Sequence, residues 1–161
     1  MKSFKEQFNS RKAKTFIIKP EASSQGKGIF LTRGHDWYNP AEHYVAQRYL
    51  HKPYLIDGLK FDLRIYVLVT SVIPIRIFLF KEGLARFATK EYISPLGSNL
   101  NNLCMHLTNY AINKENEDFI QNENVNNDDV GHKRSLTSIL QHIDAAREED
   151  PEIISAEDCM Q

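Results

Sequence analysis

Hydrophobic and polar positions alternate most clearly in the segment KFDLRIYVLVTS. Apolar side chains stand at every second position from Phe61 to Val69. The intervening positions begin with Lys60, Asp62 and Arg64. A period of two places successive side chains on opposite faces of a strand. After a turn at VIP, the segment IRIFLFK repeats the strand character and EGLARFA continues it, so we predict an antiparallel β-hairpin or meander.

Shorter apolar runs predict further strands. Residues 14–20, KTFIIKP, predict a short buried strand that ends at its proline, and residues 28–32, GIFLT, predict its hairpin partner. Residues 44–50, YVAQRYL, predict another strand. Residues 101–119 are mixed, and we expect a short strand or turn around 105–110.

One segment, residues 135–149, has the period of a helix. Its apolar residues at helical spacing are Leu136, Ile139, Leu140 and Ile143. Ser135 is placed to cap the helix. The Asn- and Asp-rich residues 122–129 before it are expected to form a mobile loop.

Charge is distributed unevenly, although the formal net charge is only −1. Residues 1–114 contain 17 Lys and Arg against 8 Asp and Glu, whereas residues 115–161 contain 3 against 13. A basic body could face an anionic partner such as a nucleotide, a nucleic acid or an acidic peptide. Alternatively, the two halves simply neutralise each other.

Composition excludes several classes of protein. The 161 residues suit one domain, contain no run of eighteen or more apolar residues, and begin too polar for a secretory signal. The two cysteines, Cys104 and Cys159, lie far apart without a partner pattern. This argues against a disulfide framework or zinc knuckle and favours a reducing compartment.

The stretch KPEASSQGKGIF places Gly26 and Gly28 around Lys27, between two predicted strands. Glycines let backbone N–H groups approach phosphate oxygens without a side-chain clash. The pattern is neither a Walker A loop nor a Rossmann turn. Alone it fits a plain hairpin turn as well as a phosphate loop. Lys19 at the end of the preceding strand favours phosphate, although a solvated strand-end lysine is common.

Other polar residues have both a structural and a functional interpretation. One strand face carries Lys60, Asp62 and Arg64, and it could simply face solvent. Alternatively it could bind a nucleotide, with Asp62 contacting the ribose or base and the two cations contacting phosphates. Arg86 is either an ion-pair partner or a carboxylate clamp. His106 is interpreted as structural.

Polar residues directly before the predicted helix, and others around residue 108, also have both a structural and a functional interpretation. Thr108 and Asn109 either cap a turn or contact a ligand, capping being the commoner use. Lys133 and Arg134, which precede the helix, are interpreted from the residues alone as a solvated pair.

Four motifs together resemble the tubulin tyrosine ligase-like family, and within it the polyglutamylase branch. They cover residues 14–114 and are FIIKPEASSQGKGIFL, YVAQRYLHKPYLIDGLKFDLRIYVLVTS, IRIFLFKEGLARFAT and MHLTNYAINK. The resemblance implies an ATP-grasp ligase that holds ATP between two antiparallel β-sheet layers. Such a ligase activates a glutamate carboxylate of a tubulin tail as an acyl phosphate, which the amine of L-glutamate attacks.

The implied fold is α+β and ATP-grasp-like, an antiparallel β-sheet core with flanking helices, incomplete at both ends. Residues 1–13 are expected to be frayed, residues 14–149 to form a partial catalytic domain, and residues 150–161 to form an acidic tail.

The resemblance also implies roles for individual residues. Lys19 and Arg64 are predicted to be catalytic, because phosphoryl transfer needs positive charge around oxygens. The predicted ATP contacts are Lys19, Gln25, Gly26, Lys27, Gly28, Ile29, Gln47, Arg48, Tyr49, Leu50, Lys60, Phe61, Asp62, Thr108 and Asn109. The predicted contacts to glutamate or the acceptor peptide are Gln25, Arg86, Tyr110 and Lys133. Backbone groups of Gln47 to Leu50 are expected to read the adenine edge.

Family members hold Mg²⁺ through an Asp and an E-x-N segment on a later strand, and we find no such segment after the helix. We therefore predict no metal ligand within this chain and expect the Mg²⁺ ligands in a missing C-terminal segment. The chain is interpreted as a shortened tubulin polyglutamylase. The alternatives are a catalytically dead ATP- or tubulin-tail-binding module and, on charge with interleaved aromatics, a nucleic-acid-binding β domain.

The expected partners follow from the leading interpretation. They are the acidic C-terminal tails of tubulin or microtubules, and L-glutamate. We expect no nucleic acid, no membrane, and a monomer in the cytoplasm, associated with the cytoskeleton and with the cilium or basal body.

Overall fold

A computed structural model describes residues 14–34, 36–37, 39, 41–122, 129–153, 155 and 158. The chain divides into two compact units. Unit 1 comprises Met1–Lys60 and Ala88–Glu117, and unit 2 comprises Phe61–Phe87 and Asp118–Gln161. The predicted frayed N-terminus, most of the predicted loop and half of the predicted tail lie outside the described residues. Antiparallel strands and few helices confirm the α+β class.

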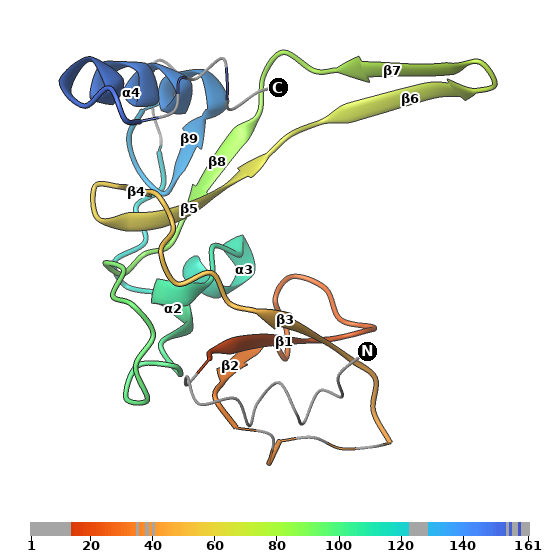
Figure 1. Ribbon diagram of the computed structural model, residues 1–161, viewed down its shortest axis with the longest axis vertical. Coiled ribbons are helices and arrows are strands. Elements are labelled where there is room, and N and C mark those ends of the chain that lie inside the picture. The colour runs from red at the N-terminus through yellow and green to blue at the C-terminus, as the bar shows by residue number, and fades with distance from the viewer. Residues whose placement is uncertain are drawn as a thin grey trace. The chain divides into compact units, whose positions relative to one another are not determined.

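Unit 1 contains the predicted N-terminal strands and two short helices (Figure 1). Its strands are β1 (Phe16–Pro20), β2 (Phe30–Thr32), β3 (Tyr44–Arg48) and β4 (Leu55–Ile56), and its helices are α2 (Leu103–His106) and α3 (Tyr110–Asn113). The first three strands form an antiparallel sheet in the order β2-β1-β3. The hairpin of β1 and β2 and the later strand β3 are therefore confirmed.

The core of unit 1 lies on both faces of this sheet. On one face Phe16 and Ile18 are buried. On the other, Leu31 packs with Tyr49 and Leu107 in a cluster that also includes partly buried residues of α2 and α3. The alternation of β1 places neighbouring residues on opposite faces, so both sets of apolar side chains leave water.

Of the strand or turn predicted around residues 105–110, the strand is wrong, because these residues end one helical turn and begin another. The N–H of Leu107 donates to Leu103 O and closes α2 at 2.8 Å. The buried side chain of Asn113 then donates to the carbonyls of Leu107 and Asn109, at 2.8 and 3.1 Å. Side-chain hydrogen bonds thus satisfy backbone groups that a strand would have paired with a neighbour.

Unit 2 contains the strands and helix of the C-terminal half (Figure 1). β5 (Leu59–Arg64) enters it from unit 1, and the other elements are β6 (Val67–Val72), β7 (Ile75–Leu79), β8 (Leu84–Phe87), β9 (Lys133–Ser135) and α4 (Leu136–Glu149). Within unit 2, β5 pairs with β8, β8 with β9, and β6 with β7. The predicted hairpin is confirmed as β6–β7.

The long alternating run is two strands rather than one. β5 ends at Arg64 and β6 begins at Val67, and the two strands have different partners. Asp62 pairs with Arg86 and Phe61 stacks on Phe87, so β5 forms its ladder with β8 and not with a strand of the hairpin. The period of two continues across the break, which is why the pattern did not reveal it.

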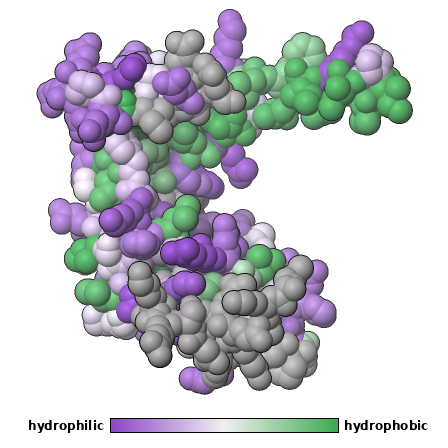
Figure 2. Space-filling model, in the orientation of Figure 1, coloured by the Kyte–Doolittle hydropathy of each residue, from purple (hydrophilic) through white to green (hydrophobic). Residues whose placement is uncertain are grey.

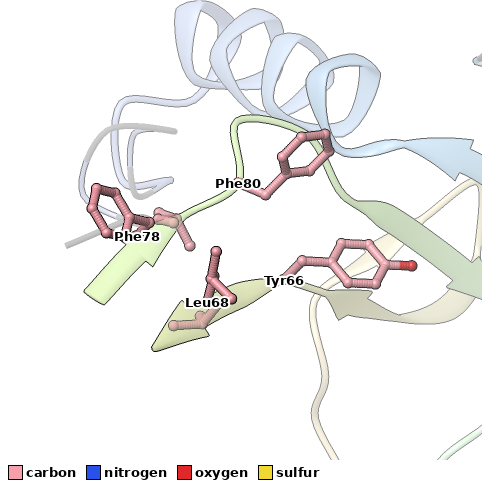
Figure 3. Close-up of a pocket in the computed structure, with 6 residues that line it drawn as sticks. Tyr66, Leu68, Phe78 and Phe80 are labelled. Atoms are coloured by element: carbon pink, nitrogen blue, oxygen red, sulfur yellow. The ribbon is translucent and has the colours of Figure 1, made fainter. Parts of the chain in front are cut away.

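The hairpin β6–β7 exposes apolar side chains at successive positions of both strands, and therefore on both of its faces. A green patch lies over it in the view of Figure 2. At its base Tyr66, Leu68, Phe78 and Phe80 are among the residues that line a cavity of about 490 Å³ (Figure 3). All six residues that line this cavity are aromatic or aliphatic. It therefore lacks the charged groups that a nucleotide needs.

The predicted helix is confirmed as α4. The hydroxyl of Ser135 accepts from the N–H of Ser138 at 3.0 Å, which is the expected N-cap. Leu136, Ile139 and Ile143 are buried along one face. Among the described residues, no helix combines the length and apolarity needed to cross a bilayer.

Strand β9 was not predicted. It pairs Lys133 with Arg86 and Arg134 with Ala85. The guanidinium of Arg134 lies over the ring of Phe87, 4.3 Å from its centroid. The interpretation of these two cations as a solvated pair is therefore wrong for Arg134, although Lys133 is exposed.

Candidate functional site

The loop between β1 and β2 has a conformation that requires glycine. Gln25, Gly26 and Gly28 all have positive φ angles, at 60°, 86° and 70°. Two tight turns follow, in which the N–H of Lys27 donates to Ser24 O and that of Ile29 donates to Gly26 O. Left-handed backbone costs little only for glycine.

Gly26 also permits a close approach to the start of α3. A Cβ at this position would lie 2.7 Å from Cδ1 of Ile112 and 3.0 Å from Cγ of Asn109. Among the described residues, the N–H groups of Gly26 and Gly28 have no hydrogen-bond acceptor. Exposed, unpaired N–H groups in a left-handed turn form a concavity that suits an anion.

Lys19 lies at the end of β1, directly before this loop. Its ammonium donates to Oε1 of Gln47 on the neighbouring strand β3, at 3.0 Å. The contact fixes the direction of the lysine while leaving two of its three N–H donors for another acceptor. Unit 1 thus brings together Lys19, Gln47, the glycine loop and Asn109.

The segment Gln47 to Leu50 divides into exposed and buried residues. Gln47, Arg48 and Leu50 are exposed, whereas Tyr49 is only 5% exposed and donates its N–H to Thr15 O. Since β3 is an outer strand of its sheet, one side of its backbone faces no other strand of that sheet. This edge, rather than the Tyr49 side chain, is available to an adenine.

A buried polar network surrounds Lys60. Its ammonium donates to the hydroxyl of Tyr49 at 3.1 Å and to His106 O at 2.8 Å, and it lies 4.7 Å from the Tyr49 ring centroid. The hydroxyl of Tyr49 contacts Nδ1 of His106 at 3.2 Å, and Nε2 of His106 contacts Asn99 O at 3.1 Å.

The proton positions in this network follow from its acceptors. The carbonyl of Asn99 can only accept, so Nε2 of His106 carries a hydrogen. In the neutral imidazole Nδ1 is then an acceptor for the hydroxyl of Tyr49, which can also donate to His106 O at 3.3 Å. Burial, opposed by the Asn99 bond and aided by the charge of Lys60, lowers the pKa of His106. Burial likewise raises the pKa of Tyr49. His106 is therefore a neutral structural residue, as predicted.

Thr108 and Asn109 are positioned by a residue that the sequence did not single out. The buried amide of Asn113 accepts from the N–H and the hydroxyl of Thr89, at 3.0 and 2.9 Å, in addition to its two donations. All four hydrogen bonds of this side chain lie within unit 1. They fix the backbone around Thr108 and Asn109 beside the glycine loop.

Asp62, Arg86 and Lys133 form one cross-strand row in unit 2. Asp62 pairs with Arg86 and Arg86 with Lys133 in the ladder, so the three side chains share a face. Nε of Arg86 donates to Oδ1 of Asp62 at 2.9 Å, and Nη2 donates to Oδ2. This bidentate pairing raises the pKa of Arg86.

Other predicted residues of unit 2 lie nearby on the same strand. Arg64 is exposed and two residues beyond Asp62, on the same face of β5. Phe61 points to the opposite face, where its ring stacks on Phe87 with centroids 5.4 Å apart. Only its backbone is therefore placed for a nucleotide. Tyr110, predicted to act with Arg86 on glutamate, belongs to unit 1.

In unit 1 a glycine loop follows the strand that carries Lys19, and among the described residues the N–H groups of Gly26 and Gly28 have no acceptor. This arrangement is compatible with a phosphate site. For metal ions the result differs: among the described residues, no group of three or more His, Cys, Asp or Glu side chains could hold one.

Sequence reasoning missed Asn113 and also Arg33. Nε of Arg33 donates to Oγ1 of Thr15 at 3.1 Å, and Nη2 donates to Pro95 O. No spacing in the sequence relates these three residues. The one available signal was that Arg33 directly follows a predicted strand.

Residues 1–156 match the profile of the Tubulin-tyrosine ligase family. The chain is 60% identical over 140 residues to "Probable beta-tubulin polyglutamylase" of Tetrahymena thermophila, covering 86% of this chain and 12% of that protein. It is 54% identical over 129 residues to "Tubulin polyglutamylase TTLL13" of Mus musculus, covering 80% and 15%. It is 48% identical over 141 residues to mouse "Tubulin polyglutamylase TTLL7", covering 88% and 15%. The chain thus spans between 12% and 15% of the length of these three relatives.

Proposed function

Because the chain belongs to the tubulin-tyrosine ligase family, we propose that it forms part of a tubulin polyglutamylase of the ATP-grasp type. The reaction joins L-glutamate to a glutamate side chain of a tubulin tail. The acceptor carboxylate takes the γ-phosphoryl group of ATP, giving an acyl phosphate and ADP, and the amine of glutamate then displaces phosphate. The product is an isopeptide bond.

The observation that carries this proposal is the glycine loop of unit 1. The left-handed Gly26 and Gly28 hold their N–H groups without an acceptor, and Lys19 stands at the strand end beside them. Phosphoryl transfer depends mainly on positioning and on positive charge around oxygens. Lys19 and the loop would bind phosphates, and the outer edge of β3 would contact the base. Mg²⁺ is proposed as the ion that accompanies ATP.

The row of Asp62, Arg86 and Lys133 is the proposed site for the carboxylates of glutamate. The side chains of Arg86 and Asp62 are 26% and 38% exposed, so a small ligand can reach the pair. Arg86 uses two of its five N–H donors on Asp62, which leaves others for an incoming carboxylate. Asp62 orients the guanidinium, and the exposed Lys133 and Arg64 add positive charge.

The acceptor is proposed to be the acidic tail of tubulin, which places the protein with the cytoskeleton. The curated relatives carry the name tubulin polyglutamylase. The excess of Lys and Arg over residues 1–114 suits an acidic peptide and predicts that its binding weakens as salt is added. Association with the cilium or basal body follows the same proposal.

A turnover assay tests the function directly. The chain is incubated with ATP, Mg²⁺, labelled L-glutamate and tubulin, and label in the tubulin tails is measured. Incorporation that depends on ATP supports the ligase. Binding of a non-hydrolysable ATP analogue without any incorporation would instead support a module that only binds.

The glutamate site is tested by Arg86→Ala, with Arg76→Ala on the exposed hairpin as the matched control. We expect Arg86→Ala to raise the KM for glutamate by about tenfold or more, because a charged hydrogen bond is lost. The KM for ATP should stay within roughly twofold. Equal losses for glutamate and ATP would refute the assignment of Arg86.

A further inference from the structure

A cationic cavity lies at the opposite end of the β2-β1-β3 sheet from the glycine loop. Its volume is about 230 Å³, and it belongs entirely to unit 1. The lining residues come from four separate segments and are Lys14, Thr15, Arg33, Arg48, Tyr49, His51, Ser94 and Pro95. Thr15 precedes β1, whereas the glycine loop follows Pro20, so about 16 Å of strand separates the two features.

Hydrogen bonds between segments hold this cavity in shape. Arg33 joins the start of β1 to the segment after β8 through Thr15 and Pro95. The hydroxyls of Tyr92 and Ser94 both donate to His51 O, at 3.0 and 3.3 Å. The cavity is therefore preformed, and a preformed site lowers the entropic cost of binding a ligand.

Charge and size define what the cavity can accept. Four of its lining residues are basic, namely Lys14, Arg33, Arg48 and His51, and none of the eight described residues that line it is acidic. Arg33 uses two of its five N–H donors internally, which leaves a fixed guanidinium with donors for an anion. A volume of about 230 Å³ is smaller than that of ordinary sites for drug-sized ligands. It suits a carboxylate group rather than a whole nucleotide.

The geometry points to a peptide exosite: this cavity binds a side-chain carboxylate of the acidic acceptor peptide. The inference rests on the proposed function, which supplies an acidic peptide as substrate. Because the cavity is separate from the glycine loop, it anchors the acceptor without contacting the phosphates. Arg48 is one of the residues that line this cavity, so its side chain can serve the peptide even if its backbone contacts the base.

The test is binding of a fluorescein-labelled octaglutamate peptide to the 161-residue chain, followed by fluorescence anisotropy. Arg33→Gln is expected to weaken binding by about tenfold, and Lys14→Gln by about threefold, since each removes a charged hydrogen-bond donor. The matched control is Lys52→Gln, which removes one positive charge beside the cavity without changing its lining. It should change the affinity by less than about twofold. Circular dichroism confirms the fold of each variant, and Lys14→Gln keeps the test decisive if Arg33→Gln unfolds.

Three results would overturn the exosite. In the first, both cavity variants bind the peptide as tightly as the wild type. In the second, Lys52→Gln loses as much affinity as they do, so that net charge alone explains binding. In the third, inorganic phosphate displaces the peptide at equal concentration, so that the cavity takes free anions. An ATP analogue titrated in parallel keeps the two proposals distinguishable, since its failure to bind would count against the proposed function and leave the peptide result intact.

Discussion

Replacing Gly26 by alanine should destabilise unit 1 and disturb the loop that we assign to phosphates. Gly26 has a φ of 86°, and its Cβ would lie 2.7 Å from Cδ1 of Ile112 and 3.0 Å from Cγ of Asn109. Cδ1 of Ile112 is the end of a flexible side chain and can move. The main cost is therefore the left-handed backbone, about 1–2 kcal/mol for an alanine.

Gly97→Ala is the matched control for this change. Gly97 also belongs to unit 1, has no left-handed φ, and has nothing within 4 Å of its Cβ position. Both variants lose the same backbone freedom in the unfolded chain, so this contribution cancels between them. The free energy of unfolding should then be lower for Gly26→Ala than for Gly97→Ala by about 1–2 kcal/mol.

Urea unfolding followed by tryptophan fluorescence measures this difference. Trp37 is the single tryptophan and contacts Phe30 and Tyr44 edge-on within unit 1, so its emission reports on that unit. The midpoints of the two variants should differ by roughly 1 M urea. Equal midpoints would show that the loop does not hold Gly26 in the left-handed conformation against α3.

Two further predictions concern the buried polar groups of unit 1. Asn113→Leu should lower the free energy of unfolding by about 3 kcal/mol, because it leaves the buried hydroxyl of Thr89 and the carbonyl of Leu107 without their partner. A urea midpoint equal to that of the wild type would contradict this. Since burial lowers the pKa of His106 from 6.5, the unfolded state binds the proton more readily, and stability should fall as pH falls below about 6.5. His106→Gln should weaken this pH dependence without abolishing it, because burial also lowers the pKa of His132. If the slope of unfolding free energy against pH were unchanged in this variant, His106 would not be a source of the pH dependence.

Local patterns predicted the elements whose side chains have a strict period. The alternation of β1 and β6, and the helical spacing of Leu136, Ile139 and Ile143, appear in the structure as strands and a helix. These patterns succeed because burial on one face selects the same residue types whatever the rest of the fold does.

The sequence could not show features that depend on distant residues. The break between β5 and β6 arises because β8 pairs with β5, and the alternation continues across that break. The three residues of β9 are too few to show a period. The turns around Asn113 depend on a side chain that reaches back to carbonyls four and six residues earlier. Each of these depends on pairing or packing that a local pattern does not contain.

The candidate site likewise contains residues that the sequence indicated and partners that it could not show. Glycine spacing and a strand-end lysine indicated the loop that we assign to phosphates. The alternation of polar and apolar residues indicated that Lys60 and Asp62 share one face of a strand. The partners were hidden, since Lys60 joins Tyr49 and His106, whereas Asp62 joins Arg86 across the sheet. Both interpretations offered for Arg86 are compatible with the structure, because its ion pair with Asp62 leaves donors for a carboxylate.

The most direct test of the central claim is a titration of the isotope-labelled chain with a non-hydrolysable ATP analogue, followed by NMR. We expect the largest amide shifts in residues 25–29 and at Lys19 and Asn109. We also expect that Lys19→Ala weakens binding by roughly tenfold to a hundredfold while Lys52→Ala does not, because a charged phosphate contact is lost. Saturable binding that leaves these amides unshifted, or that is unchanged in Lys19→Ala, would contradict the account.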